Sequence, residues 1–343
     1  KPISVVRRED YFGEKDANDI LLQYGPERIH QCVELAKAPP VHRVLRMSDV
    51  QKINIDEVEK VPTGVQPLDK KLHGGLPFGG VSVITGKAGD GKSTFASCVI
   101  ASAISNGYSA LIYSGEMLNG VVRETIDRQI AGAGEIELCE NQWHDTYSKL
   151  SDFKRSQIGD WYHDSLFLYD SDNLSQEEEK EDLIQTITDS VKRMNVRVVL
   201  LDNLMTAIEI DAGNEYSMQT EFMKKLVRLA KSLDILIILV AHKRKSGMAD
   251  NGNDEISGSS NIANLATVTL SYERFNNCGQ YERKLKIYKN RLFGTIDSEG
   301  IIMTYDPVSK RVSSSTAEAV QEYDWKPVTT QASIDDLPPW EEQ

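Results

Sequence analysis

The segment from Gly86 to Ser93 constrains the fold of this chain more than any other. It reads Gly-Lys-Ala-Gly-Asp-Gly-Lys-Ser and completes the pattern Gly-x-x-x-x-Gly-Lys-Ser/Thr. An apolar, strand-like run at 81–85 precedes it, and a helix-forming stretch at 93–105 follows. A Gly-rich turn can match by chance, but the order strand, loop, helix favours a loop whose backbone N–H groups surround a polyphosphate.

This loop predicts a nucleoside triphosphate as substrate and Mg²⁺ as cofactor. Lys92 is expected to reach the β- and γ-phosphates, and the Ser93 hydroxyl to hold Mg²⁺. The helix N-terminus adds a partial positive charge. The loop residues expected to bind nucleotide are Gly86, Ala88, Gly89, Asp90, Gly91, Lys92, Ser93 and Thr94.

Charge is unevenly distributed along the 343 residues, which carry a formal net charge of −13. Acids concentrate at 170–182 and in the tail at 332–343, whereas bases cluster at 242–245 and 284–291. The acidic total therefore does not exclude a locally basic channel for nucleic acid.

Nothing in the sequence points to secretion or to a membrane. No apolar run is long enough to span a bilayer, and no apolar, positively flanked leader is present. The four cysteines lie far apart without Cys-x-x-Cys spacing, which fits a reducing compartment better than a zinc site or a disulfide framework. We expect a cytoplasmic protein of a bacterium or a phage-infected cell, with the mitochondrial matrix as the alternative.

Strand-like and helix-like runs alternate from residue 61 onward. Strands are expected at 81–85, 110–114, 165–170, 197–202, 235–241, 266–272, 282–289 and 300–305, and helices at 92–105, 119–132, 142–157, 175–194 and 215–233. Ser175 and Glu178 form a capping box for the fourth helix. Alternation followed by consecutive strands predicts an α/β fold with a mainly parallel central sheet and an antiparallel extension.

Two acids are placed to serve hydrolysis. Asp202 ends the apolar run at 198–202 and would lie at the carboxyl edge of the sheet, where an acid can hold Mg²⁺. Glu116 follows the strand at 110–114, where it could orient and deprotonate water. The alternatives are that Asp202 only ends its strand and that Glu116 caps the following helix.

A basic loop follows the central strand at 235–241. His242 ends that strand and could sense the γ-phosphate, although a histidine at a strand end is often only structural. The residues expected to contact nucleic acid are Lys243, Arg244, Lys245, Ser246 and Gly247, because phosphate contacts dominate such binding. A solvated surface loop is the alternative.

Lys289 and Arg291 are two residues apart, so both would face the same side of a strand. They could form an ordinary basic surface. They could also enter the active site of a neighbouring subunit, with an arginine finger that stabilises transition-state charge. Their spacing does not decide between the two.

Together these segments resemble the hexameric replicative helicases of the DnaB type, particularly phage primase–helicases and the Twinkle helicase. The segments that carry the resemblance, in the family's order, are PTGVQPLDKKLHGGLPFGG at 62–80, GKAGDGKSTFA at 86–96, YSGEM at 113–117, VVLLDN at 198–203, ILVAHKRK at 238–245, ISGSSNIANLAT at 256–267 and YKNRLFGTIDSEG at 288–300. The resemblance covers roughly residues 60–310 and implies a RecA-like core forming a homo-hexameric ring around single-stranded DNA.

The resemblance also implies roles for single residues. Glu116 would be the catalytic base, Asp202 the second acid and His242 the γ-phosphate sensor, whereas Lys289 and Arg291 would act in trans. Arg274 and Tyr305 would sandwich the nucleotide base, of ATP or dTTP. Asn264 stands where the family usually has Gln, and the loop at 243–257 matches a DNA-binding loop.

The ends of the chain fit the same resemblance. Residues 1–38 look like the remnant of a TOPRIM-type domain from an upstream primase, and 39–60 like a linker that packs on the neighbouring subunit. Residues 61–312 would form the helicase domain. The acidic tail at 313–343 would be disordered or would dock a partner such as a DNA polymerase.

The sequence therefore predicts a ring helicase that couples hydrolysis to movement on single-stranded DNA and to unwinding of duplex at a replication fork. Two alternatives remain: a RecA-like strand-exchange recombinase, and a nucleotide-gated scaffold that recruits replication proteins without unwinding.

Overall fold

The computed structural model describes residues 4–37, 43–172, 183–204, 206–207, 215–242, 260–314 and 321–326. The chain divides into two compact units, residues 1–54 and 55–343, of which the second holds the central sheet. None of the helices in these ranges is long and apolar enough to cross a bilayer.

The N-terminal unit is a short helical hairpin. It contains η1 (Arg8–Tyr11), α1 (Ala17–Tyr24), α2 (Pro26–Glu34) and η2 (Met47–Asp49). Asp16 caps α1 by accepting hydrogen bonds from the N–H groups of Asn18 and Asp19. Ile20 and Cys32 are the buried side chains of the two α-helices. Whether this unit is the remnant of a TOPRIM-type domain stays a prediction.

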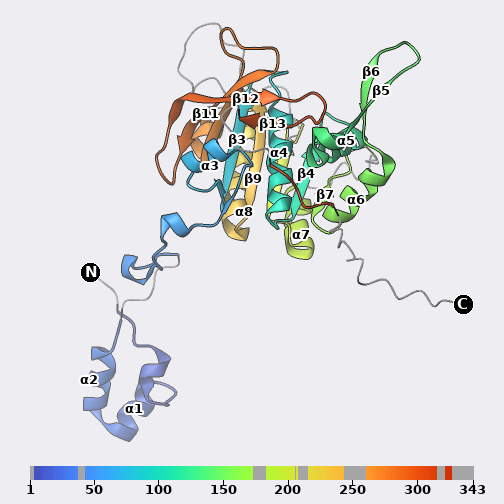
Figure 1. The fold of residues 1–343 in the computed structure, drawn as a ribbon. Coiled ribbons are helices and arrows are strands. Elements are labelled where there is room, and N and C mark those ends of the chain that lie inside the picture. The colour runs from blue at the N-terminus through green and yellow to red at the C-terminus, as the bar shows by residue number, and fades with distance from the viewer. Residues whose placement is uncertain are drawn as a thin grey trace, which may run out of the picture. The chain divides into compact units, whose positions relative to one another are not determined.

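The second unit is built on a nine-stranded sheet in the order β13-β12-β11-β10-β3-β9-β8-β4-β7 (Figure 1). The strands from β10 to β7 in that order pair in parallel, and β10, β11, β12 and β13 pair antiparallel. Their bounds are β3 (Gly80–Gly86), β4 (Ala110–Ser114), β7 (Leu166–Leu168), β8 (Val198–Asp202), β9 (Leu236–His242), β10 (Val268–Glu273), β11 (Glu282–Asn290), β12 (Asp297–Tyr305) and β13 (Val312–Ser314). The predicted parallel sheet with an antiparallel extension is confirmed.

Alternate residues of the central strands enter two different hydrophobic cores. Ile84, Leu200 and Ile238 pack into one core together with α4, whereas Val83 and Leu239 pack into the other together with α8. This alternation is the period-two pattern of a strand buried on both faces.

Seven helices or short helical turns of this unit connect or cover the strands in the described ranges. They are η3 (Ile55–Glu57), α3 (Gln66–Lys71), α4 (Lys92–Ser105), α5 (Asn119–Ala131), η4 (Ala133–Glu135), α6 (Asp152–Tyr162) and α7 (Leu183–Met194). Two further helices, α8 (Glu215–Leu233) and α9 (Ser260–Leu265), flank β9 in the sequence. The helices predicted at 92–105, 119–132 and 215–233 agree with α4, α5 and α8 to within one residue.

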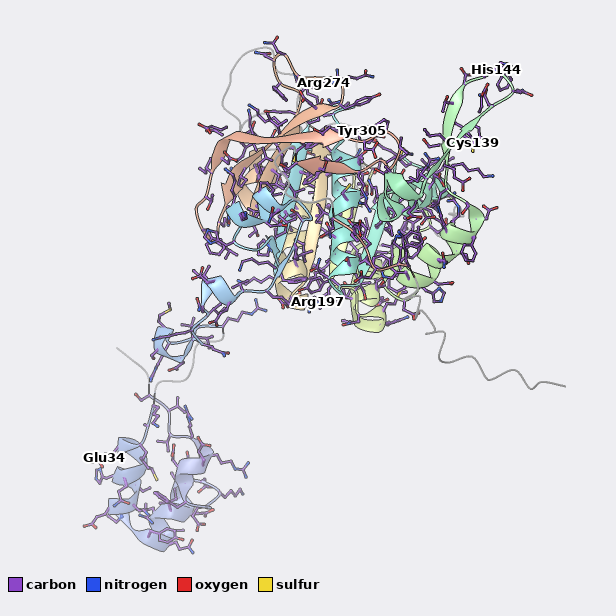
Figure 2. The ribbon with its side chains drawn as sticks, viewed as in Figure 1. Glu34, Cys139, His144, Arg197, Arg274 and Tyr305 are labelled. Atoms are coloured by element: carbon purple, nitrogen blue, oxygen red, sulfur yellow. The ribbon has the colours of Figure 1, made fainter. Side chains whose placement is uncertain are left out.

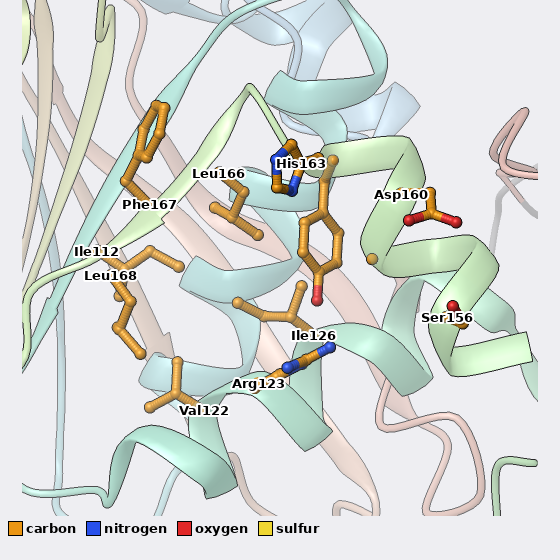
Figure 3. A pocket seen from close by; sticks show the side chains of 12 residues that line it. Ile112, Val122, Arg123, Ile126, Ser156, Asp160, His163, Leu166, Phe167 and Leu168 are labelled. Atoms are coloured by element: carbon orange, nitrogen blue, oxygen red, sulfur yellow. The ribbon is translucent and has the colours of Figure 1, made fainter. Parts of the chain in front are cut away.

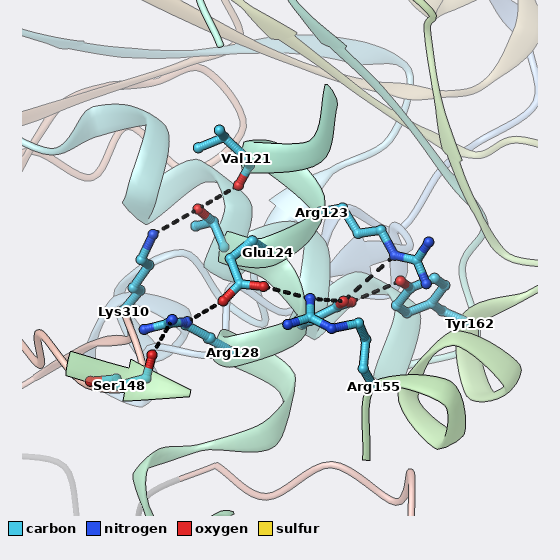
Figure 4. A network of polar contacts seen from close by, with 10 residues as sticks. Val121, Arg123, Glu124, Arg128, Ser148, Arg155, Tyr162 and Lys310 are labelled. Atoms are coloured by element: carbon cyan, nitrogen blue, oxygen red, sulfur yellow. Dashed lines mark hydrogen bonds and ion pairs between the residues drawn. The ribbon is translucent and has the colours of Figure 1, made fainter. Parts of the chain in front are cut away.

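A network of charged side chains joins α5 to α6 (Figure 4). The fully buried carboxylate of Asp127 accepts a 2.8 Å hydrogen bond from the Tyr162 hydroxyl and lies 3.3 Å from Arg155. Glu124 pairs with Arg155 at 2.5 Å and with Arg128 at 2.6 Å. Because α5 begins three residues after Glu116, this network also anchors the segment that carries the candidate base.

The helix predicted at 142–157 is wrong in its first half. Residues 137–149 form a two-stranded hairpin, β5 (Glu137–Glu140) and β6 (Thr146–Lys149), and α6 begins only after Ser151, which caps it. Figure 2 shows Cys139 and His144 on this hairpin, which projects from the domain. Its side chains are mostly exposed on both faces, so no apolar stripe marks it in the sequence.

The helix predicted at 175–194 lies only partly within the described residues. Of the helix predicted at 175–194, the structure describes α7 from residue 183 onward, and the capping box of Ser175 and Glu178 lies outside the described residues. The short strands β1 (Lys60–Val61) and β2 (Leu76–Pro77) pair with each other and were not predicted.

The folded domain extends beyond the boundary predicted at 312. Residues of β13 pair with β12, and Trp325 packs in the first core with 6% of its surface exposed. Tyr323 lies against Trp161 of α6, with ring centroids 6.1 Å apart. Residues 327–343, with the predicted partner-docking tail, lie outside the described residues.

Candidate nucleotide site

The phosphate loop joins the end of β3 to the start of α4, as the sequence predicts. A Cβ on Gly86 would lie 2.1 Å from the carbonyl oxygen of Tyr272, so no larger residue fits there. Gly89 and Gly91 have φ values of +77° and +95°, in the left-handed region that favours glycine. The shape of the loop therefore depends on glycine at these positions, and the Asp90 carboxylate adds to it by accepting a 2.9 Å hydrogen bond from the Lys87 N–H.

Lys92 points back across the loop. Its Nζ donates to the Lys87 carbonyl at 2.8 Å and lies 3.3 Å from Nδ1 of His242. Burial lowers the pKa of Lys92, and the neighbouring carboxylates of Asp90, Asp202 and Glu116 oppose that effect. The Lys92 ammonium is partly desolvated and lies near three carboxylates. When a nucleotide binds, phosphate oxygens can replace the Lys87 carbonyl and His242 as its hydrogen-bond partners.

Ser93 and Asp202 form the candidate magnesium centre. The Ser93 hydroxyl donates to Asp202 Oδ1 at 3.0 Å, and burial raises the pKa of Asp202. A hydroxyl and one carboxylate are hard oxygen ligands of the type that Mg²⁺ binds together with substrate phosphates and water. The described residues contain no group of three or more His, Cys, Asp or Glu placed to hold a metal.

Glu116 lies beside this centre. The β4–β8 pairing sets Ser114 opposite Asp202, and the Gly115 N–H donates to the Asp202 carbonyl at 2.8 Å. A Cβ on Gly115 would lie 2.1 Å from the hydroxyl of Thr206, so the close approach requires glycine. Glu116 Oε1 lies 3.6 Å from His242 Nε2 and is 54% exposed in its side chain, open to water.

His242 occupies the end of β9, paired in register with Gly86 of the phosphate loop. Its ring lies between Lys92 and a residue that the sequence analysis assigned no role, Asn203. The Asn203 Nδ2 lies 3.2 Å from His242 Nε2 and donates to Glu116 Oε1. Its position directly after Asp202 was visible in the sequence, but the side chain it reaches was not.

Tyr305 lines a cavity of 160 Å³ next to the phosphate loop. The other residues that line it are Gly89, Asp90, Gly91, Thr94, Tyr272, Gln280, Tyr281, Arg283 and Val312. The Tyr281 and Tyr305 rings lie 6.0 Å apart, and Arg283 Nε donates to the Asp90 carbonyl at 2.9 Å. Tyr281 and Arg283 were not predicted.

Arg274 does not line that cavity. Its side chain is 67% exposed, and its Nε lies 3.9 Å from Asp90 Oδ1 (Figure 2 labels both Arg274 and Tyr305). The predicted sandwich of a base between Tyr305 and Arg274 stays a prediction, and Arg283 is an arginine that does line the cavity.

Lys289, Arg291 and Asn264 lie together, away from this chain's own phosphate loop. Lys289 Nζ donates to the carbonyls of Ala263 and Asn264 at 2.6 and 2.9 Å, and Arg291 also donates to the Asn264 carbonyl. Burial and the charge of Arg291 lower the pKa of Lys289 to about 8. The role in nucleotide binding that the resemblance implies for Asn264 stays a prediction.

The distance to the phosphate loop follows from strand register. The Arg291 N–H donates to Thr267, and the Thr267 N–H donates to Val81, at the start of β3. The phosphate loop begins at the opposite end of that strand, at Gly86, about 16 Å away at the usual rise per residue. That separation exceeds the reach of an arginine side chain.

A second cavity, of 410 Å³, lies between α5, α6 and the edge strand β7 (Figure 3). Its apolar lining comes from Ile112 of β4, from Val122 and Ile126 of α5, and from Leu166, Phe167 and Leu168 of β7. No residue of the phosphate loop lines it. The predicted DNA-binding residues 243–247 lie outside the described residues.

Comparison with known proteins agrees with this geometry. The family model described as "ATPase: KaiC" matches residues 61–305, most of the chain. The chain belongs to the KaiC family of ATPases. Its RecA-like P-loop domain implies a nucleotide as substrate, and Ser93 and Asp202 supply ligands that suit Mg²⁺.

Relatives of this KaiC-family ATPase are named DNA repair protein RadA and protein RecA. The chain is 24% identical over 298 residues to the DNA repair protein RadA of Mycobacterium tuberculosis, which covers 86% of this chain and 50% of that protein. It is 26% identical over 311 residues to RadA of Aquifex aeolicus, covering 89% and 56%. Protein RecA of Gloeothece citriformis is 23% identical over 267 residues, covering 73% and 64%.

The chain thus spans about half the length of the curated RadA relatives it matches. The names of these relatives and the matching family model refer to RecA-like ATPases, not to DnaB-type helicases. The membership in the RecA-like ATPases is established, and the narrower resemblance to replicative helicases stays a prediction.

Proposed function

We propose that this chain is a DNA-dependent NTPase that works as an oligomer, with each hydrolysis site completed by a neighbouring copy. The observation that carries the proposal is the position of Arg291. This residue lies about 16 Å, measured along the sheet, from the phosphate loop of its own chain. An arginine that stabilises transition-state charge must touch the γ-phosphate, so Arg291 serves a second copy.

The chemistry within one copy follows from the residues around the loop. Loop N–H groups and Lys92 bind the phosphates, and Ser93 with Asp202 would hold Mg²⁺, which bridges phosphate oxygens and neutralises their charge. Glu116 accepts the proton of the attacking water. His242 lies within hydrogen-bond distance of Lys92 and so registers whether the phosphates occupy the loop.

Coupling to single-stranded DNA rests on the basic segment that starts at residue 243, directly after His242. Phosphate contacts by such a segment ignore base sequence, which suits a motor that moves along DNA. The expected upstream primase, polymerase partner and hexameric state remain predictions from the resemblance.

The first candidate for the biological role is strand exchange or another step of DNA repair. The relatives named RadA and RecA support it, since each matches more than two thirds of this chain. The second candidate is the ring helicase of a replication fork. It is supported by the ordered motif set at 62–300, by Glu116 beside Asp202 and by the distant Arg291.

The proposal is tested by NTP hydrolysis with and without single-stranded DNA, for the wild type and Arg291→Ala. We expect DNA-stimulated turnover that Arg291→Ala lowers by about three orders of magnitude. Mixing Arg291→Ala with Lys92→Ala should restore part of the rate, because a mixed interface joins an intact loop to an intact finger. If the hydrolysis rate is the same with and without DNA and is unchanged in Arg291→Ala, the proposal is wrong and the nucleotide-gated scaffold is the supported alternative.

The two roles separate in a further pair of assays on the same preparation. Closed rings in electron micrographs together with ATP-dependent fork unwinding support the helicase. Open filaments together with strand exchange between homologous DNA molecules support the recombinase.

A further inference from the structure

Asn203 connects three residues of the candidate site that come from separate strands. It follows Asp202 at the end of β8, and its side chain reaches Glu116 beyond β4 and His242 at the end of β9. The residue is 2% exposed. A buried amide placed between a candidate base and a candidate phosphate sensor calls for an account of its hydrogen bonds.

The orientation of this amide follows from its neighbour in the loop. Asn203 Oδ1 accepts a hydrogen bond from the backbone N–H of Thr206 at 3.2 Å, and the Thr206 hydroxyl donates to the Asn203 carbonyl at 3.1 Å. A backbone N–H can only donate, so the oxygen of the amide faces Thr206 and the NH₂ faces the site. Nδ2 therefore donates to Glu116 Oε1.

The imidazole of His242 cannot satisfy both of its neighbours at once. Lys92 Nζ is a donor, so Nδ1 at 3.3 Å must be the unprotonated nitrogen and the ring proton lies on Nε2. This N–H meets a second donor, Asn203 Nδ2, at 3.2 Å, and an acceptor, Glu116 Oε1, lies 3.6 Å from Nε2. Asn203 and His242 therefore converge on the same carboxylate oxygen.

Bound nucleotide would change that arrangement. When Lys92 moves to the phosphates, Nδ1 is free to carry the ring proton and to donate it in a hydrogen bond to the γ-phosphate. Nε2 then becomes an acceptor for the second hydrogen of the Asn203 amide. The proton leaves one nitrogen and returns to the other through water, with no net change in charge, and Glu116 is left with one donor instead of two.

We propose that Asn203 is a positioning residue that couples the state of His242 to the orientation of the Glu116 carboxylate. The inference rests on the proposed function, because it assigns Asn203 to the path from the DNA-binding segment after His242 to the catalytic base. Removing the amide should leave nucleotide binding intact and disconnect hydrolysis from DNA.

The experiment measures kcat and KM for ATP, with and without a single-stranded oligonucleotide, in Asn203→Ala and Asn203→Asp. Both variants should lower the ratio of DNA-stimulated to basal kcat at least about tenfold, with KM within about threefold of the wild type. In Asn203→Asp the Thr206 N–H keeps its acceptor, and the oxygen now facing Glu116 repels it. A fluorescent ATP analogue checks that each variant still binds nucleotide.

Asn141→Ala is the matched control, because it makes the same substitution in the turn between β5 and β6, outside the candidate site; its stimulation ratio should equal that of the wild type. Equal losses of basal and stimulated rates in both Asn203 variants, or an unchanged ratio, overturn the coupling role. If DNA does not stimulate hydrolysis by the wild type, the proposed function is wrong. The experiment therefore distinguishes failure of the proposed function from failure of the coupling role of Asn203.

Discussion

The hydroxyl of Ser93 donates a 3.0 Å hydrogen bond to Oδ1 of Asp202 and so joins the first turn of α4 to the last residue of β8. The two residues are 109 positions apart in the sequence. Parallel strands bring them together because the carboxyl ends of β3 and β8 lie at one edge of the sheet, with only β9 between them.

Asp202→Asn should abolish metal-dependent hydrolysis. The amide keeps the size of the side chain but removes the negative charge that Mg²⁺ needs, so we expect kcat to fall by about two to three orders of magnitude. Phosphate release assays across a Mg²⁺ titration measure this. Asp189→Asn on α7 is the control and should retain the wild-type rate. A hydrolysis rate near wild type in Asp202→Asn would show that Asp202 does not hold Mg²⁺.

Gly86→Ala should destabilise the domain and prevent nucleotide binding. The new Cβ would meet the Tyr272 carbonyl at 2.1 Å, and shifting backbone in a packed sheet costs about 2–3 kcal/mol in free energy of unfolding. Gly89→Ala meets nothing within 4 Å and carries only the strain of its φ of +77°, about 1 kcal/mol. Urea denaturation compares the two; equal losses would contradict the steric argument.

Loss of Asp127 should cost more stability than loss of its tyrosine partner. Asp127→Ala removes the acceptor of both the Tyr162 hydroxyl and Arg155, and losing hydrogen bonds to a buried carboxylate costs about 2–3 kcal/mol. Tyr162→Phe removes a single hydrogen bond, about 1–2 kcal/mol. Chemical denaturation should rank the variants in that order, and the reverse order would show that the network does not hold α6 on α5.

Tyr305→Ala should weaken nucleotide binding more than Arg274→Ala. Tyr305 lines the cavity at the loop and stacking on a base is worth about 1–3 kcal/mol, so KM should rise roughly tenfold. Arg274 is mainly exposed and does not line that cavity, so its removal should change KM little. Steady-state kinetics with ATP and dTTP make the comparison. A larger effect of Arg274→Ala would support the sandwich expected from the sequence.

Lys289 should make stability depend on pH above neutrality. Its pKa in the folded chain is about 8, lowered by burial and by Arg291, whereas the unfolded chain holds this proton to about 10.4. Between those values the unfolded state binds more protons, so the contribution of Lys289 to the free energy of unfolding rises with pH.

Urea denaturation at several pH values between 7 and 10 tests this for the wild type and Lys289→Met. The wild type should gain stability relative to the variant as pH rises through about 8. Lys192→Met, at an exposed lysine of α7, is the control and should follow the wild type. A constant difference between wild type and Lys289→Met across this range would contradict the lowered pKa.

The sequence by itself predicted the nucleotide-binding loop and the places of the sheet's main strands along the chain. The phosphate loop, Asp202, Glu116 and His242 each stand at the end of an apolar run, and such runs are local patterns that a single chain displays. Because parallel strands end at one edge, those ends predict a shared site without knowledge of the register.

The tertiary structure alone decided which side chains meet. Register between β10 and β11 places Arg291 far from its own loop, and the turn at Thr206 aims Asn203 at Glu116 and His242. Tyr281 and Arg283 reach the cavity from residues nearly two hundred positions after the loop. Such contacts depend on pairing between distant segments, and local propensity does not contain that information.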